Sequence, residues 1–361
     1  MSHPHSHSGH PGVAAPAVIA WEVTRRCHLK CRHCRAAACD IPYENEFSTE
    51  ECRRVIDNLA AFCQPVLIFT GGEPMTRPDI YELIRYAADR GLKPVIAPCG
   101  QLLTPESVDR LKEAGCLGAS ISLDAPDAAA HDAFRGTPGA FAGTLRGIAC
   151  LREAGLPLQV NTTVTRLNAD RLPEMIDLAV SLGAHTLDLF FLVPTGRGAT
   201  LRDLEISPAD YERLLAWVCA TAPTAPLRLK TTCAPHIARL QASRGDGAPA
   251  SRHGGHGGGC MGGKGFVFIS HIGILQPCGF LDLPCGDLRA ANYDFQKLYA
   301  TSPEFLALRD VDGLHGKCGL CEYRRNCSGC RARAFARDGD WLGEEPGCVY
   351  RPRGAGAAPR G

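Results

Sequence analysis

The cysteines constrain this chain more than any other residue type, because many of them fall into two tight groups far apart in the sequence. The chain has 361 residues and contains 19 cysteines. Three lie together near the N-terminus, and seven crowd the last third. Such groups would form disulfides in an oxidising compartment, whereas in a cytoplasmic chain of this length they indicate metal ligands. The other nine are scattered, which is typical of small buried apolar residues.

The overall charge and hydropathy pattern exclude several classes of partner. A formal net charge of +1 gives no field that would hold nucleic acid or a membrane surface. No apolar run reaches the roughly 18 residues of a membrane span, and the start of the chain does not resemble a secretory signal. We therefore expect a cytoplasmic chain. The His-rich segments 1–10 and 253–256 are typical of disordered tails and linkers rather than of metal sites.

Strand and helix patterns alternate over the first half of the chain. Ser48 and Glu51 form a capping box that starts one helix. Six strand–helix units in series predict an α/β fold, in which a parallel sheet curves into a partial (β/α)₆ barrel with its functional groups at the C-terminal strand ends. The six expected strands are Val18–Val23, Val66–Thr70, Lys93–Ala97, Gly118–Leu123, Leu158–Val164 and Thr186–Val193.

Composition shifts divide the chain into five segments. We expect a disordered tail over 1–16 and a barrel core over 17–200. A bridge and flexible linker should cover 201–259, with helix from Pro208 to Leu240. A small cysteine-rich domain should cover 260–350, and a second disordered tail 351–361.

The first cysteine group has the spacing C-x₃-C-x₂-C and follows the first expected strand directly. Thiolates of Cys27, Cys31 and Cys34 would ligate three irons of a [4Fe–4S] cluster and leave its fourth iron open. S-adenosylmethionine (SAM) can chelate that iron, and one electron from the cluster then splits its sulfonium to release a 5′-deoxyadenosyl radical. A zinc site or inert cysteines are the alternatives, although zinc motifs usually supply four ligands in two pairs.

A second motif, Gly71-Gly72-Glu73-Pro74, ends the second expected strand. Glycine allows a close backbone approach to a ligand, and Glu73 can receive the ammonium group of SAM. With both motifs the chain resembles the radical SAM superfamily from residue 18 to about residue 194. The resemblance implies SAM ribose contacts from Ser122 and Asp124. Where relatives often carry Thr-Asn-Gly, this chain has Pro98-Cys99-Gly100, so the adenosine contact in that loop stays open.

The second cysteine group resembles the SPASM domain that follows many radical SAM barrels. Its spacing is Cys260-x₁₂-Gly273-x₄-Cys278, then Cys318-x₂-Cys321-x₅-Cys327-x₂-Cys330, then Cys348. The resemblance implies one auxiliary [4Fe–4S] cluster on Cys318, Cys321, Cys327 and Cys348, and a second on Cys260, Cys278 and Cys330. Cys285 is a candidate fourth ligand of the second cluster; otherwise one iron is open.

We hypothesise that this second cluster accepts the electron left after substrate oxidation. Whether the region binds one or two auxiliary clusters is left open. A zinc-ribbon-like site that holds the segment together in place of the clusters also stays open.

Four short sequence segments resemble those of the haem synthase family of the siroheme-dependent pathway. They are residues 20–27, 161–166, 192–198 and 232–236. This resemblance implies oxidative decarboxylation of two propionates of Fe-coproporphyrin III to vinyl groups, giving protohaem. An iron porphyrin would be the substrate, and flavodoxin or ferredoxin the low-potential electron donor. Arg166 and Arg197 are expected to bind its carboxylates. Cys233 and His236 are candidate ligands of its iron; the alternative is that they are a buried cysteine and a capping histidine.

Two other functions stay open. One is a SPASM peptide maturase that modifies a ribosomal precursor peptide. Many of these carry a peptide-binding domain of roughly 80 residues, for which we expect no room ahead of Cys27, although a separate chain could supply it. The other is a ferredoxin-like electron carrier, which would explain the clusters but not the three-cysteine motif on a six-unit barrel. The sequence identifies no catalytic side chain.

Overall fold

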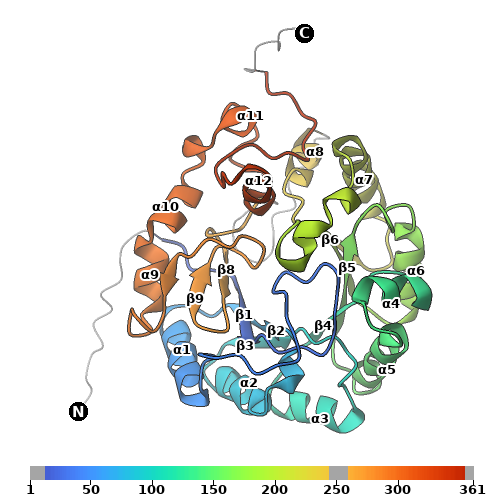
Figure 1. The fold of residues 1–361 in the computed structure, drawn as a ribbon, viewed down its shortest axis with the longest axis vertical. Helices are drawn as coiled ribbons and strands as arrows, with labels where there is room; N and C mark the ends of the chain where they lie inside the picture. Colours follow the sequence, from blue (N-terminus) through green and yellow to red (C-terminus); the bar gives the residue numbers. More distant parts are fainter. Residues whose placement is uncertain (1–12, 244–258, 354–361) are drawn as a thin grey trace.

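The computed structural model describes residues 13–243 and 259–353, which form a ten-stranded sheet surrounded by helices (Figure 1). The strands are β1 (Val18–Thr24), β2 (Val66–Gly71), β3 (Lys93–Ile96), β4 (Ala119–Ser122), β5 (Leu158–Val164), β6 (Thr186–Phe191), β7 (Arg228–Thr232), β8 (Phe266–Ile269), β9 (Ile274–Gln276) and β10 (Gly286–Asp287). Expectations for the His-rich segments, for most of the linker and for most of the two tails fall outside the described residues.

Twelve α-helices occur in the described part of the chain: α1 (Thr49–Phe62), α2 (Ile80–Asp89), α3 (Pro105–Glu113), α4 (Ala128–Arg135), α5 (Ala140–Glu153), α6 (Leu172–Ser181), α7 (Pro208–Thr221), α8 (Ile237–Ser243), α9 (Phe295–Thr301), α10 (Pro303–Arg309), α11 (Gly316–Gly319) and α12 (Arg331–Asp338). Short 3₁₀ turns are η1 (Pro74–Thr76), η2 (Gly196–Thr200), η3 (Arg202–Leu204) and η4 (Val311–Gly313). The capping box at α1 is confirmed, since the Ser48 hydroxyl accepts from the Glu51 backbone and Glu51 accepts from the Ser48 backbone. None of these helices is both long and apolar enough to cross a lipid bilayer.

The strand order is β10-β9-β8-β1-β2-β3-β4-β5-β6-β7. Neighbours from β1 to β7 all pair in parallel, which confirms the expected α/β class and the six strands predicted from the sequence. The expected helical stretch from Pro208 to Leu240 also contains β7, which the sequence reading missed. That strand reads Arg-Leu-Lys-Thr-Thr and lies at the sheet edge, so it lacks the apolar run of a central strand.

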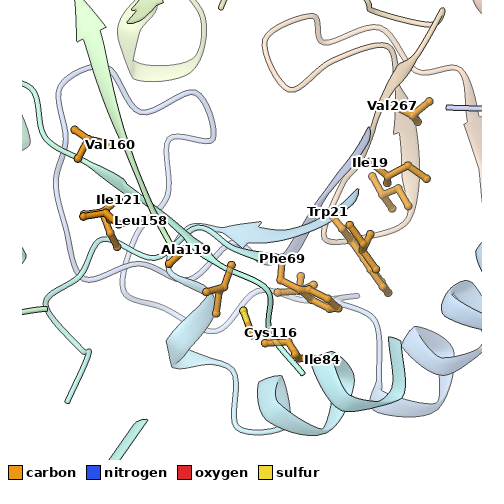
Figure 2. Packing of buried hydrophobic residues seen from close by; sticks show 14 of the residues in the cluster. Ile19, Trp21, Phe69, Ile84, Cys116, Ala119, Ile121, Leu158, Val160 and Val267 are labelled. Carbon is orange, nitrogen blue, oxygen red and sulfur yellow. The ribbon is translucent and has the colours of Figure 1, made fainter. Parts of the chain in front are cut away.

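The cysteine-rich region extends the sheet of the barrel. Its strand β8 pairs in parallel with β1, and β9 and β10 follow in antiparallel order. Figure 2 shows Val267 of β8 in the same packing layer as Ile19 and Trp21 of β1 and Phe69 of β2, and all four side chains are fully buried. One hydrophobic core therefore runs beneath the barrel strands and the first strand of the C-terminal region.

Parallel strands place their C-terminal ends along one edge of a sheet. The cysteine loop follows β1, the Gly-Gly-Glu-Pro motif ends β2, the Pro98–Gly100 loop follows β3, and Ser122 ends β4. The curved sheet thus collects the motifs read from the sequence at one side of the molecule.

Candidate functional site

The cysteine loop after β1 is a compact unit. The side chains of Cys27 and Cys31 are buried and pack with Leu29 and Ala38, and Cys34 lies half-buried against them. The Cys27 amide donates to the Cys39 carbonyl, which closes the loop, and the Ala38 amide lies 3.5 Å from the Cys34 sulfur. The three thiols therefore share one small pocket of side chains, as three ligands of one cluster require.

Arg197 holds this loop in place. Its Nε donates to the Cys31 carbonyl over 2.8 Å and its Nη1 to the Ala38 carbonyl over 2.6 Å, while its own amide donates to the Cys34 carbonyl. Two of the three guanidinium nitrogens thus have carbonyl partners within the chain, and the expected contact of Arg197 with substrate carboxylates stays a prediction. Arg166 likewise donates its Nη1 to the Asp203 carbonyl over 3.0 Å. A substrate role for either arginine is not supported by these contacts.

The glycines of the second motif pack against the cysteine loop. A Cβ at Gly71 would lie 2.2 Å from the Thr24 carbonyl oxygen, and one at Gly72 would lie 2.3 Å from that of Arg25. The Gly72 amide also donates to the Thr24 carbonyl over 2.8 Å. The close approach that requires glycine here is therefore between two segments of this chain, where we had expected it toward SAM.

Glu73 is fully buried and joins the loops that follow β2 and β3. Its Oε1 accepts from the Met75 amide over 3.0 Å, at the start of η1 with Pro74, and its Oε2 accepts from the Cys99 amide over 2.7 Å. Burial raises its pKa above the ordinary value. Glu73 thus fixes the loop whose sequence departs from the common pattern; its expected contact with the SAM ammonium stays a prediction.

Asp124 and Ser122 lie at the end of β4 in different environments. Ser122 is half-buried, while Asp124 is buried and its Oδ2 lies 2.7 Å from Nε of Arg135. Its Oδ1 accepts from the Thr163 amide over 2.8 Å. Burial alone would raise the pKa of Asp124, but the charge of Arg135 lowers it below the ordinary value. Oδ1 thus has a hydrogen-bond partner, and Oδ2 has an ion-pair partner but no hydrogen bond within the described residues. The ribose contacts of Ser122 and Asp124 stay predictions, and the half-buried Ser122 is the more accessible of the two.

Arg135 brings this ion pair to the cysteine loop. Its Nη1 lies 3.7 Å from the Cys31 sulfur. No sequence pattern indicates this role, because Arg135 is the last residue of an otherwise ordinary helix, α4. A buried positive charge beside a thiolate favours its ionised, metal-binding form.

Four cysteines of the second group line one cavity that is partly open to solvent. They are Cys318, Cys321, Cys327 and Cys348. The Glu345 amide points at the Cys318 sulfur over 3.3 Å, and the Gly329 amide at the Cys327 sulfur over 3.4 Å. Four cysteines around one cavity, with amide donors directed at two of the sulfurs, supply the thiolate ligands that an iron–sulfur cluster needs. Within the described residues, no three of these thiols are arranged closely enough to hold a single metal ion. The set is the one that the SPASM resemblance implies for a single cluster.

His236 also lines this cavity and is buried, with its ring 4.3 Å from that of Tyr211 in a T-shaped contact. Burial lowers its pKa to about 4, so the ring is neutral. His236 thus lies beside four thiols of the C-terminal region, which does not support it as a ligand of a porphyrin iron.

The remaining cysteines separate into two places. Cys330 is buried at the start of α12 and packs with Cys278, whereas Cys285 belongs to the main hydrophobic core. The thiol of Cys285 donates to the Leu283 carbonyl over 3.3 Å. Cys285 is therefore not supported as a fourth ligand beside Cys278 and Cys330.

Arg35 was not singled out in the sequence, although a basic residue directly after Cys34 was a signal for it. Its guanidinium lies 4.3 Å from the ring centre of Phe268 on β8, and its Nη1 lies 3.9 Å from the carboxylate of Glu22 on β1. Burial alone would raise the pKa of Glu22, but the charge of Arg35 and further donors lower it to about 2. Arg35 thus spans the space between the cysteine loop and the C-terminal region.

Comparison with known proteins gives a consistent result. The Radical SAM superfamily model matches residues 21–203. The chain is 47% identical to a Nitratidesulfovibrio vulgaris protein named AdoMet-dependent heme synthase, with 98% of both chains covered. It is 46% identical to a Methanosarcina barkeri protein of the same name, over 94% of this chain and 97% of that one. The crystal structure of Streptococcus suis SuiB bound to SAM has a TM-score of 0.73 at 19% identity, over 93% of this chain and 77% of that one, and shares the fold.

Sequence identity close to one half along nearly the whole chain agrees with the C-x₃-C-x₂-C loop on a parallel α/β sheet. Membership of the superfamily implies a [4Fe–4S] cluster and SAM as cofactors. This chain belongs to the radical SAM superfamily and, within it, to the family of the AdoMet-dependent heme synthases.

Proposed function

We propose that this radical SAM enzyme is an oxidative decarboxylase that converts two propionates of Fe-coproporphyrin III into vinyl groups, giving protohaem. The observation that carries the proposal is the similarity along nearly the whole chain to proteins named AdoMet-dependent heme synthase. It favours a porphyrin over a precursor peptide as the substrate.

The SAM-binding cluster would be held by Cys27, Cys31 and Cys34. Arg197 would hold their loop through its hydrogen bond to the Cys31 carbonyl, and the positive charge of Arg135 would stabilise the Cys31 thiolate. When bound, the cluster and SAM would supply a 5′-deoxyadenosyl radical that removes a hydrogen from the β-carbon of a propionate, after which loss of CO₂ and one electron leaves a vinyl group. Ser122 would contact the ribose of SAM, and the backbone of Gly71-Gly72-Glu73-Pro74 would line the site of its methionine moiety.

Cys318, Cys321, Cys327 and Cys348 would hold one auxiliary [4Fe–4S] cluster, and Cys260, Cys278 and Cys330 a second. The first cluster is supported by the single cavity that its four cysteines line, and by the backbone amides that point at the sulfurs of Cys318 and Cys327. A cytoplasmic location would keep these thiols reduced, and a low-potential donor such as flavodoxin or ferredoxin would deliver the electrons.

Arg35 is the cation best placed to bind a substrate carboxylate. Its Nη2 is buried and has no hydrogen-bond partner within the described residues. The side chain reaches from the cysteine loop to β8, and a Cβ at Gly279 would lie 3.2 Å from its Nε. A guanidinium pairs with carboxylates through two parallel hydrogen bonds. We therefore assign this role to Arg35 in preference to Arg166 and Arg197.

The proposal is tested by anaerobic incubation of the reconstituted enzyme with SAM, dithionite and Fe-coproporphyrin III, followed by mass spectrometry. The expected result is two successive losses of about 46 Da, which is CO₂ plus two hydrogens, with 5′-deoxyadenosine formed in step. A Cys27→Ala variant is the control and should abolish both products. Formation of 5′-deoxyadenosine with an unchanged porphyrin mass would contradict the substrate and favour a peptide maturase.

A further inference from the structure

Cys233 lies beside the cysteines of the second auxiliary set. It follows β7 directly, and its side chain packs with Cys278 and Cys330 around Val193 and Leu281. Its side chain packs against the buried side chain of Cys330. The sequence places Cys233 close to neither partner, so only the fold brings the three sulfurs together.

The backbone of Cys233 is held in a conformation that residues with a Cβ rarely adopt. Its φ is +61°, in the left-handed region. The Cys233 carbonyl accepts from the Tyr211 hydroxyl over 2.7 Å and from Nη2 of Arg333 over 3.1 Å. Strained conformations persist where the surrounding structure enforces them, and they concentrate at functional sites. Two buried donors thus fix the direction in which this thiol leaves the chain.

Cys260 completes the group. A Cβ at Gly262 would lie 3.7 Å from the Cys260 sulfur and 3.4 Å from the Pro277 carbonyl oxygen, which places this sulfur beside the residue before Cys278. The Cys260 amide donates to the Cys327 carbonyl over 3.0 Å, so the two sets of cysteines adjoin each other. Cys285 belongs to the main core, and its thiol donates to the Leu283 carbonyl.

We propose that Cys233 supplies the fourth thiolate to the auxiliary cluster held by Cys260, Cys278 and Cys330. This inference rests on the part of the proposed function that places a second auxiliary cluster at these three residues. All four irons would then have a protein ligand, so this cluster would exchange electrons without binding substrate or solvent at an iron. The same assignment removes Cys233 as a ligand of the porphyrin iron.

Electron paramagnetic resonance of the reduced auxiliary clusters tests the assignment. A Cys27→Ala/Cys31→Ala/Cys34→Ala parent removes the SAM-binding cluster and should retain about eight iron per chain. In that parent, Cys233→Ala is expected to open one iron, so that added cyanide shifts the spectrum of one auxiliary cluster. The matched control Cys285→Ala should keep the parent spectrum and its lack of response to cyanide.

If Cys233→Ala loses about four iron, Cys233→Ser decides, because a serine oxygen can replace the sulfur. A changed spectrum and reduction potential of one auxiliary cluster in Cys233→Ser, with the other unchanged, supports the assignment. A parent spectrum and parent iron content in both Cys233 variants would overturn it. A parent with only about four iron would instead contradict the second auxiliary cluster itself.

Discussion

At the scale of single residues, Arg35 connects two regions that are far apart in the chain. It follows Cys34, the last cysteine ligand expected in the cysteine loop after β1. Its guanidinium contacts the aromatic ring of Phe268 on β8 and lies near the buried carboxylate of Glu22. This combination leaves a charged donor without a full complement of partners between the two groups of cysteines. Such a donor is suited to a substrate that carries carboxylates.

We expect Arg35→Ala to lower kcat/KM for Fe-coproporphyrin III by at least about tenfold, because a hydrogen bond to a charged group contributes about 1.5–3 kcal/mol. The kcat/KM of Arg35→Lys should lie between those of the parent enzyme and Arg35→Ala, since lysine keeps the positive charge but not the paired donors. Initial rates of vinyl formation measure the effect, with Arg166→Ala as an unaffected control. An equal loss of iron would instead give Arg35 a structural role in the cysteine loop.

Residue-scale roles were also the hardest to read from the sequence. The position of Arg197 after the sixth strand was correctly expected, but its contacts with Cys31 and Ala38 depend on how the barrel curves. Cys285 was named as a candidate fourth ligand from its place in the sequence alone. Counting cysteines treats them alike, whereas β7 and the start of α12 decide which thiols meet.

At the scale of elements, α4 supports the cysteine loop with three side chains from eight residues. Arg135 approaches the Cys31 sulfur, and Phe134 stacks on His33 with ring centres 4.3 Å apart. The third residue, His131, accepts a hydrogen bond at Nδ1 from the Asp124 amide over 3.2 Å. A small shift of α4 would therefore disturb the loop at several points.

His131 predicts a pH dependence for this element. Burial lowers its pKa from 6.5 to about 4, so the unfolded state takes up a proton first as the pH falls. Stability is then complete above pH 6.5 and is lost progressively between pH 6.5 and pH 4, by roughly 1 kcal/mol at pH 5.5. The free energy of unfolding, measured anaerobically with denaturant at pH 7.5 and pH 5.5, should show this loss. The His131→Asn variant should lose less stability between the two pH values. Equal losses in both proteins would mean that His131 titrates alike when folded and unfolded.

Element types were more readable than element boundaries or edges. The six central strands were found because they are apolar runs between capped helices, and hydrophobic burial acts on them locally. The edge strand β7 and the pairing of β8 with β1 were missed. Both depend on contacts between distant segments, which leave little pattern within the strands.

At the scale of the whole molecule, β1 is a central strand, flanked by β2 on one side and by β8 on the other. Arg289 strengthens this connection, since its Nε donates to the Glu51 carboxylate of α1 over 2.6 Å. The cysteine-rich region is thus part of the barrel's own sheet and core.

We therefore expect a fragment of residues 1–243 to fail to fold stably. Removing β8 uncovers Ile19 and Trp21, and each large side chain that loses its burial costs about 1.5–3 kcal/mol. Circular dichroism and 5′-deoxyadenosine formation measure the outcome. A full-length Cys318→Ala/Cys321→Ala variant, which keeps β8, should retain SAM cleavage. A fragment as active as that variant would show that the barrel is stable without β8.

The continuous hydrogen-bonded sheet between β1 and β8 has a consequence for how the two propionates would be processed. Main-chain pairing ties β8 of the cysteine-rich region to β1, the strand that leads into the cysteine loop. We therefore expect the C-terminal region to move little relative to that loop after the first vinyl group forms. The macrocycle itself would have to turn or leave and rebind, and a monovinyl porphyrin should then be found free in solution during turnover.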